Sequence, residues 1–168
     1  NRIGTMLLSG ILLDTKQFSQ NAGARTFSAA LYLRAEGANP AEAQALFKTD
    51  LSDFMREARF TKNIKMLRNF IAIAINDEDG NSYPDDIAAA KAADRLLTID
   101  GVQASFTLCR INDAIVIKAR SAGYINVQLI MEMLGGGGNR SAAAVQFKEM
   151  ELPEAVYMVY KAIDDYFS

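Results

Sequence analysis

A change in the spacing of apolar residues near residue 60 constrains the fold of this chain more than any other feature. Before it, apolar side chains recur at helical spacing. After it, residues 102–109 alternate between apolar and polar side chains, which is typical of a β-strand with one buried face. The sequence therefore predicts a helical part over residues 1–60 and an α/β domain over residues 61–168.

The α/β domain is expected to contain a small mixed sheet flanked by helices. Its predicted strands cover residues 64–67, 70–75, 102–109, 115–119 and, at an edge of the sheet, 145–148. The predicted helices of the whole chain cover residues 2–13, 26–37, 41–47, 51–58, 85–99, 127–134 and 156–167, and residues 76–81 are expected to form a loop.

Composition narrows the class of protein. Half of the 168 residues are hydrophobic, so the chain has enough apolar side chains for a core without disulfides. The single cysteine, Cys109, rules out a disulfide framework, and with no histidine to activate it we expect a buried structural thiol. The net charge of −2 favours a small anionic ligand over long nucleic acid, whose partners are usually basic. No apolar run is long enough to span a membrane.

Four consecutive glycines, Gly135, Gly136, Gly137 and Gly138, follow the helix predicted over residues 127–134. A run without side chains lets backbone N–H groups point into one concavity and lets an anion approach the main chain. A helix C-cap explains one glycine and a flexible hinge is the alternative for the rest. The run lacks the Gly-Lys-Ser/Thr ending of a P-loop. We interpret it as a site for a phosphate or a nucleotide.

Polar residues near the glycines extend this candidate site. Arg120 ends a predicted strand, and Ser121 and Asn126 follow it closely. An arginine fork can hold two phosphate oxygens at once, although an arginine at a strand end is often only a solvated charge. We expect these three residues and Asn139 to contact the ligand.

The carboxylates alone do not indicate a metal site. Asp14 ends the first predicted helix, where an aspartate is often only part of a turn. The acidic segment over residues 77–81 has its glycine too early for a calcium loop, and Ala88 stands where a bidentate Glu would be needed. The chain has no histidine, the commonest transition-metal ligand and general base.

Three stretches of the chain resemble a known family. They cover residues 8–18, residues 25–34, and residues 119–144 with the Arg-Ser pair and the glycine run. Together they resemble the C-terminal part of a DHH-type phosphoesterase followed by its DHH-associated domain. The likeness extends over nearly the whole chain and is greatest to cyclic di-AMP phosphodiesterases of the GdpP type.

The resemblance implies a role for each candidate residue. Asp14 would be one ligand of a two-manganese centre. Arg120, Ser121, Asn126 and the glycine loop would hold the phosphate and nucleoside of a small cyclic or linear dinucleotide. The parent enzyme would be a hydrolase, anchored in the bacterial plasma membrane with this part facing the cytoplasm.

Two departures from the family pattern affect these expectations. The family places a histidine after the four glycines, whereas this chain has Asn139, which cannot carry a charge or act as a general acid. The other metal-binding motifs of the family, including Asp-His-His, would lie upstream of Asn1. The apolar helical spacing also begins at once, without a predicted N-cap. We therefore expect a fragment that is inactive alone and that lacks the N-terminal half of its DHH domain.

Other functions fit the same residues. A DHH-type exonuclease or oligoribonuclease would act on short RNA, a non-catalytic nucleotide sensor would agree with Asn139, and an RNA-binding module would resemble the associated domain of alanyl-tRNA synthetases. Exposed apolar faces on the helical part would favour a homodimer.

Overall fold

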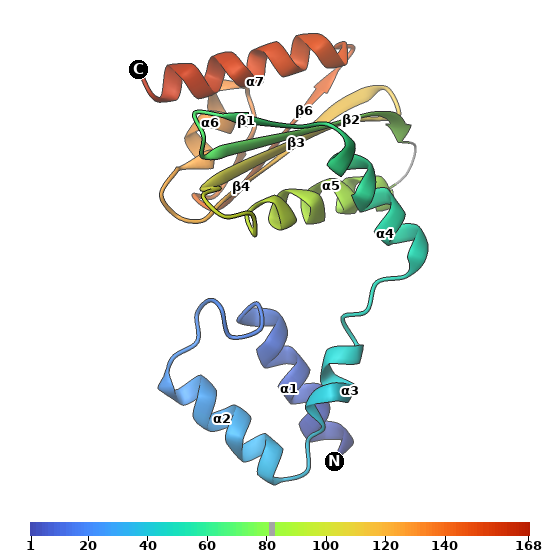
Figure 1. Ribbon diagram of the computed structural model, residues 1–168, viewed down its shortest axis with the longest axis vertical. Coiled ribbons are helices and arrows are strands. Elements are labelled where there is room, and N and C mark those ends of the chain that lie inside the picture. The colour runs from blue at the N-terminus through green and yellow to red at the C-terminus, as the bar shows by residue number, and fades with distance from the viewer. Residues whose placement is uncertain (81–82) are drawn as a thin grey trace. The chain divides into compact units, whose positions relative to one another are not determined.

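The structure, a computed structural model, describes residues 1–80 and 83–168. These residues form two compact units, Asn1–Asp50 and Leu51–Ser168, and each has its own core (Figure 1). The helix predicted over residues 51–58 belongs to the second unit by its contacts, while the expected domain division after residue 60 stays a prediction.

The first unit contains three helices, α1 (Arg2–Asp14), α2 (Ala24–Ala35) and α3 (Pro40–Ala45). Its small core contains four buried residues, Leu8, Leu12, Ala38 and Ala43. The helices predicted in this part are thus present. The N-terminus of α1 differs from the expectation, because Asn1 is its N-cap and the Oδ1 atom of Asn1 accepts a hydrogen bond from Gly4 N–H at 3.2 Å.

The second unit alternates helices and strands around one sheet. Its elements are α4 (Leu51–Ala58), a 3₁₀ turn η1 (Arg59–Lys62), β1 (Ile64–Leu67), β2 (Ile71–Gly80), α5 (Tyr83–Leu96), β3 (Ala104–Ile111), β4 (Ala114–Ser121), α6 (Val127–Met133), β5 (Gly137–Gly138), β6 (Ala142–Lys148) and α7 (Leu152–Tyr166).

The six strands lie in the order β1-β2-β3-β4-β6-β5. Only β2 and β3 pair in parallel, and α5 provides the crossover that a parallel pair requires. All other neighbouring strands are antiparallel. The small mixed sheet flanked by helices that the sequence predicts is therefore confirmed.

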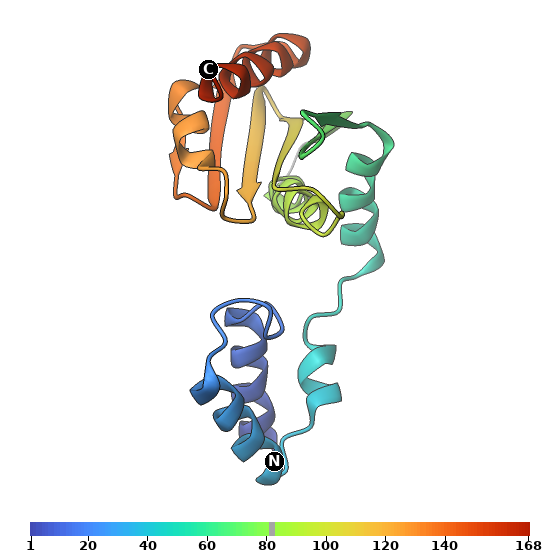
Figure 2. The same cartoon turned by 60° about the vertical axis from the view of Figure 1, so that its left-hand side comes forward.

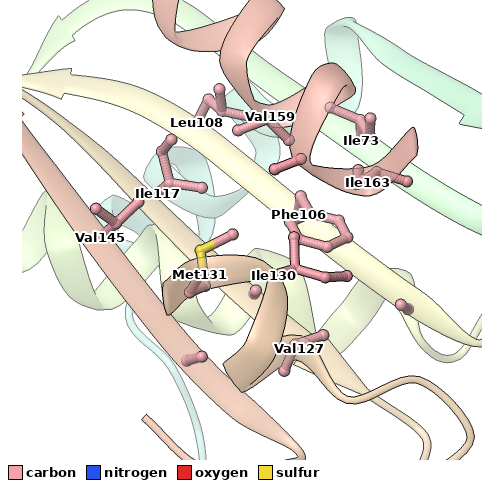
Figure 3. Packing of buried hydrophobic residues seen from close by; sticks show 14 of the residues in the cluster. Ile73, Phe106, Leu108, Ile117, Val127, Ile130, Met131, Val145, Val159 and Ile163 are labelled. Atoms are coloured by element: carbon pink, nitrogen blue, oxygen red, sulfur yellow. The ribbon is translucent and has the colours of Figure 1, made fainter. Parts of the chain in front are cut away.

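Helices cover both faces of the sheet, with α5 on one face and α6 and α7 on the other (Figures 1 and 2). On the α6/α7 face, inward side chains of β3 and β4 such as Phe106 and Ile117 pack against Ile130, Met131 and Val159 (Figure 3). The opposite face is lined by small residues, including Ala72, Ala74, Ala89 and Ala92. Because alternate residues of a strand face opposite sides, two-sided burial fixes the register of the central strands.

Two strand predictions are wrong in extent. Residues 76–80 belong to β2 instead of a loop, although the pairing with β3 shifts register between Asn76 and Gly80; residue 81, the last of the expected loop, lies outside the described ranges. The strand predicted at the sheet edge over residues 145–148 is β6, which begins at Ala142 and lies between β4 and β5. Gly137 and Gly138 form the two-residue strand β5 beside Ala143 and Ala144 only, so the predicted residues 145–148 lie at the sheet edge but the start of β6 does not.

Cys109 lies in β3 and is buried against the α5 face, as expected of a structural thiol. Burial raises the pKa of this thiol to about 12, and the nearby carboxylates of Asp86 and Asp85 act in the same direction. The thiol is therefore protonated at neutral pH and is a poor nucleophile.

The buried thiol predicts a pH dependence of stability. Its pKa in the folded chain is raised above the ordinary value of 9.0, so its contribution is complete below about pH 9 and is lost as the pH rises toward 12. Urea titration measures the free energy of unfolding at each pH. Its decrease with pH should be steeper in the wild type than in Cys109→Ala, by about 1.4 kcal/mol per pH unit. Equal slopes for the two proteins between pH 9 and 11 would contradict this assignment.

The glycine run predicts a contrast between two neighbouring substitutions. A Cβ atom on Gly136 would lie 2.3 Å from the carbonyl oxygen of Ala144 and 2.6 Å from Cβ of Val145, whereas one on Gly137 would meet nothing within 4 Å. Gly136→Ala should lower the free energy of unfolding by about 1–3 kcal/mol. Gly137→Ala is the matched control and should change it by less than about 1 kcal/mol. Urea titration followed by circular dichroism measures both, and similar losses would rule out the close approach at Gly136.

Candidate functional site

The four glycines connect the end of α6 to the edge of the sheet. Gly135 has φ +81° and donates its N–H to the Glu132 carbonyl at 3.0 Å, and Gly136 donates to the Met131 carbonyl at 2.8 Å. This pair of bonds is the Schellman arrangement that ends a helix with a left-handed residue. Two of the four N–H groups are thus used inside the protein.

The later glycines pair with β6. Gly137 lies opposite Ala144 and Gly138 opposite Ala143. Gly138 has φ +151°, and a Cβ atom there would lie 2.4 Å from the Ala142 carbonyl oxygen. Backbone geometry therefore accounts for glycine at positions 135, 136 and 138, and the ligand contact expected of the run stays a prediction.

The turn after β5 is held by Asn139. Its Oδ1 atom accepts hydrogen bonds from Ser141 N–H at 3.0 Å, from Ala142 N–H at 2.9 Å and from the Ser141 hydroxyl at 3.1 Å. Its carboxamide nitrogen forms no hydrogen bond within the residues that the structure describes. That nitrogen is therefore available as a neutral donor to a ligand.

Ser121 and Asn126 bound a loop whose bonds are mostly local. The Ser121 hydroxyl accepts from Gly123 N–H at 3.0 Å. Asn126 is the N-cap of α6, where its Oδ1 accepts from Gln128 N–H at 3.1 Å. The backbone N–H of Asn126 donates to the Tyr166 hydroxyl at 3.1 Å, which ties this loop to the end of α7.

Backbone bonds join this loop to the turn after β5. Ser121 N–H donates to the Ser141 carbonyl at 2.9 Å, and Val127 N–H donates to the Arg140 carbonyl at 3.2 Å. We call residues 121–126 and 139–141 together the sheet corner. It brings Ser121, Asn126 and Asn139 together at one end of β4 and β6, and the ligand contacts expected of them stay a prediction.

Arg120 lies beside the corner but faces α5. Ile117 and Ala119 of β4 point into the α6/α7 core, so Arg120 points to the other face, as expected from alternation. Its Nε atom lies 3.4 Å from Oδ2 of Asp94 in α5, and its Nη1 donates to the Ala119 carbonyl at 3.0 Å. The side chain is 19% exposed, so the guanidinium is restrained while part of it remains accessible.

The register places Arg120 at the same end of the sheet as the glycine run. Arg120 pairs with Ala142 of β6, and the adjacent Ala143 pairs with Gly138. Two strand spacings separate β4 from β5, which corresponds to roughly 10 Å. A ligand of dinucleotide size spans that distance.

Asp14 is the last residue of α1 and is exposed. It belongs to the first unit, and the expected manganese contact stays a prediction. Among the described residues, no group of three or more His, Cys, Asp or Glu side chains comes together to hold a metal ion. The residues of this chain therefore do not by themselves fit a two-metal centre.

Two further residues, one in the corner and one that contacts it, are not predicted by the sequence. Arg140 follows Asn139 directly, and its Nε donates to the Gly123 carbonyl at 3.2 Å. Its charge beside the glycine run is the signal for it in the sequence. Tyr166 is 40 residues from Asn126 in the sequence, so only the tertiary structure brings its hydroxyl to the loop.

None of the helices in the described ranges has both the length and the apolar composition for a membrane span.

Comparison with known proteins identifies the family. A family profile described as the DHHA1 domain matches residues 68–168. The chain is 44% identical over 163 residues to the cyclic-di-AMP phosphodiesterase PdeA of Listeria monocytogenes, covering 96% of this chain and 24% of PdeA. It is 43% identical over 164 residues to the cyclic-di-AMP phosphodiesterase GdpP of Geobacillus thermodenitrificans, covering 97% of this chain and 25% of GdpP.

The chain thus spans about a quarter of the length of these curated relatives. A crystal structure of an exopolyphosphatase-related protein from Bacteroides fragilis superposes with a TM-score of 0.78 at 18% identity, over 93% of this chain and 48% of that one, which shows a shared fold. The resemblance expected from residues 8–18, 25–34 and 119–144 is confirmed, and the chain belongs to the DHHA1 domain family.

Proposed function

We propose that this chain is the substrate-binding part of a metal-dependent phosphodiesterase that hydrolyses cyclic di-AMP to the linear adenosine dinucleotide. The observation that carries the proposal is the 43–44% identity to two cyclic-di-AMP phosphodiesterases over nearly the whole chain. The sheet corner supports it, because polar groups and a guanidinium meet there beside a stretch of main chain without side chains.

In this proposal the chain binds and orients the ligand. Arg120 is suited to a phosphate because Asp94 and the Ala119 carbonyl engage its Nε and Nη1, while its Nη2 has no hydrogen bond among the described residues. Asn126 and the carboxamide nitrogen of Asn139 supply neutral polar contacts. Holding the scissile diester in one orientation lowers the entropic part of the activation barrier.

The metal chemistry is assigned to residues outside this chain. Asp14 contributes one carboxylate, and the remaining ligands of the manganese centre come from the N-terminal half of the DHH domain. When bound, the two ions supply an activated water and stabilise charge on the phosphate oxygens. The longer protein is proposed to be held at the bacterial plasma membrane, and the chain of 168 residues should bind cyclic di-AMP without cleaving it.

Arg120 gives the direct test. Arg120→Ala in this chain should raise the dissociation constant for cyclic di-AMP about 10- to 100-fold, since a hydrogen bond to a charged phosphate contributes about 1.5–3 kcal/mol. Isothermal titration calorimetry measures the constant. Arg110→Ala is the matched control, because Arg110 pairs with Glu151 at 2.7 Å near the other end of the strands.

The same titration, together with a hydrolysis assay of the longer protein, decides the substrate class. Binding of cyclic di-AMP by the wild type and the control, with loss in Arg120→Ala, supports the proposal. A preference of the longer protein for hydrolysing a short RNA dinucleotide over cyclic di-AMP would instead support an exonuclease. Absence of any binding of cyclic di-AMP by this chain would refute the proposed role.

A second function, a nucleotide sensor without catalysis, is favoured by Asn139. This residue stands where the family pattern has histidine, and its oxygen is occupied in the turn. Asn can donate a hydrogen bond to a phosphate but cannot deliver a proton as histidine does.

Restoring the histidine separates the enzyme from the sensor. Asn139→His in the longer protein should raise the rate of cyclic di-AMP hydrolysis if the protein is an enzyme whose turnover is reduced by Asn. Asn139→Gln serves as the control for the altered turn, because it also removes the short Asn side chain without adding a titratable group. Zero hydrolysis in the wild type and in Asn139→His, with binding retained, would indicate a sensor.

A further inference from the structure

Arg140 is an exposed, charged residue of the sheet corner, and its side chain is anchored by a hydrogen bond. Its Nε donates to the Gly123 carbonyl at 3.2 Å, and its own carbonyl accepts from Val127 N–H at 3.2 Å. Main chain and side chain of Arg140 therefore both contact the loop between β4 and α6. The guanidinium is fixed along one edge beside Ser121 and Asn126.

No ion pair of Arg140 is present among the described side chains. Within residues 1–78 and 85–168, no carboxylate oxygen lies within ion-pair distance of its guanidinium. The other cations on β3 and β4 are paired, Arg110 with Glu151, Lys118 with Asp86 and Arg120 with Asp94. Arg140 differs from them in that its charge meets solvent at the corner.

The hydrogen bond to Gly123 leaves the two terminal nitrogens of the Arg140 guanidinium available to a ligand. The bond to Gly123 uses Nε–H, so the N–H groups on the two terminal nitrogens have no partner within the described residues. Two of these N–H groups, one on each nitrogen, match the spacing of two oxygens on one phosphate. Because the anchor already restricts the side chain, a ligand orders fewer rotamers on binding.

We propose that Arg140 binds a non-bridging phosphate oxygen pair of the phosphodiester ligand at the sheet corner. The inference rests on the proposed function and adds a binding residue to it. Arg120 on the α5 side and Arg140 at the tip of the turn lie on different elements of the same sheet end. In this proposal Arg140 holds one phosphate of the dinucleotide, and the other phosphate is left for other groups at this sheet end.

A bracing role makes the opposite prediction and sets the choice of variants. If Arg140 only braces the loop through Gly123, a neutral side chain that can donate one hydrogen bond replaces it. If Arg140 binds phosphate, the charge is what matters. Arg140→Gln keeps a donor and removes the charge, Arg140→Lys keeps the charge and removes the planar fork, and Arg140→Ala removes both.

The experiment is calorimetric titration of the 168-residue chain with cyclic di-AMP and with the linear adenosine dinucleotide. We expect Arg140→Ala and Arg140→Gln to weaken binding about tenfold or more and Arg140→Lys to weaken it less. Arg110→Gln removes the same charge near the other end of the strands and should bind like the wild type. Melting temperatures, measured alongside, should stay similar among the Arg140 variants.

Each other outcome overturns the inference in a distinct way. Wild-type affinity in Arg140→Gln and Arg140→Lys with weakened binding in Arg140→Ala identifies a brace and leaves the proposed function intact. Wild-type affinity in all three variants shows that Arg140 does not contact the ligand. A wild type that binds neither dinucleotide refutes both the proposed function and the role of Arg140.

Discussion

The structure of the second unit depends on the antiparallel pairing of β3 with β4, whose side chains are buried on both faces. Phe106, Leu108, Ile115 and Ile117 on one face are fully buried under α6 and α7. The other face meets α5 through alanines, so this helix lies close to the sheet. There the hydroxyls of Ser105 and Thr107 donate to α5 carbonyls, Ala93 at 2.6 Å and Ala89 at 2.8 Å. Buried polar groups are thus satisfied without a break in the core.

This central pair places the candidate site. The end of β4 delivers Arg120 and Ser121, and β6, paired with β4, begins at the same end. The loop that leads into α6 and the turn that follows β5 therefore meet at the sheet corner. Their mutual backbone bonds arise from that meeting and not from local sequence. The site lies at a sheet end because strand termini are where the backbone leaves the ladder and polar side chains become accessible.

Much of the fold could be predicted because the spacing of apolar residues reports the period of each element. The helices and most strands follow from it, and the turn at Asn112 and Asp113 connects β3 to β4. The spacing of apolar residues predicts no element where the residues have no side chains. Gly137 and Gly138 have none, so the sequence does not predict β5 or the start of β6 at Ala142 beside it. The acidic residues 77–79 at the end of β2 have the composition of a loop, and the pairing of β2 with β3 shifts register between Asn76 and Gly80, so the apolar spacing does not report this part of the strand.

The site was predictable only in part for a related reason. Ser121, Asn126 and Asn139 are close in sequence to the glycines, and the sheet brings them together. The partner of Arg120 is Asp94, 26 residues earlier on α5, and no local pattern links the two. The glycine run was interpreted through ligand binding, whereas its conformation follows from the Schellman end of α6 and from close contact with Ala142 and Ala144.

The hydrogen bond from Asn126 to the Tyr166 hydroxyl has a practical consequence for handling the protein. Tyr166 occupies the final turn of α7, packs edge to face on Phe167 with ring centroids 4.9 Å apart, and stands two positions before Ser168. Fusion partners or purification tags attached at the carboxyl end would adjoin the same turn of α7 that holds the loop before α6 through this hydrogen bond. Recombinant versions intended for affinity work are better extended at the amino end.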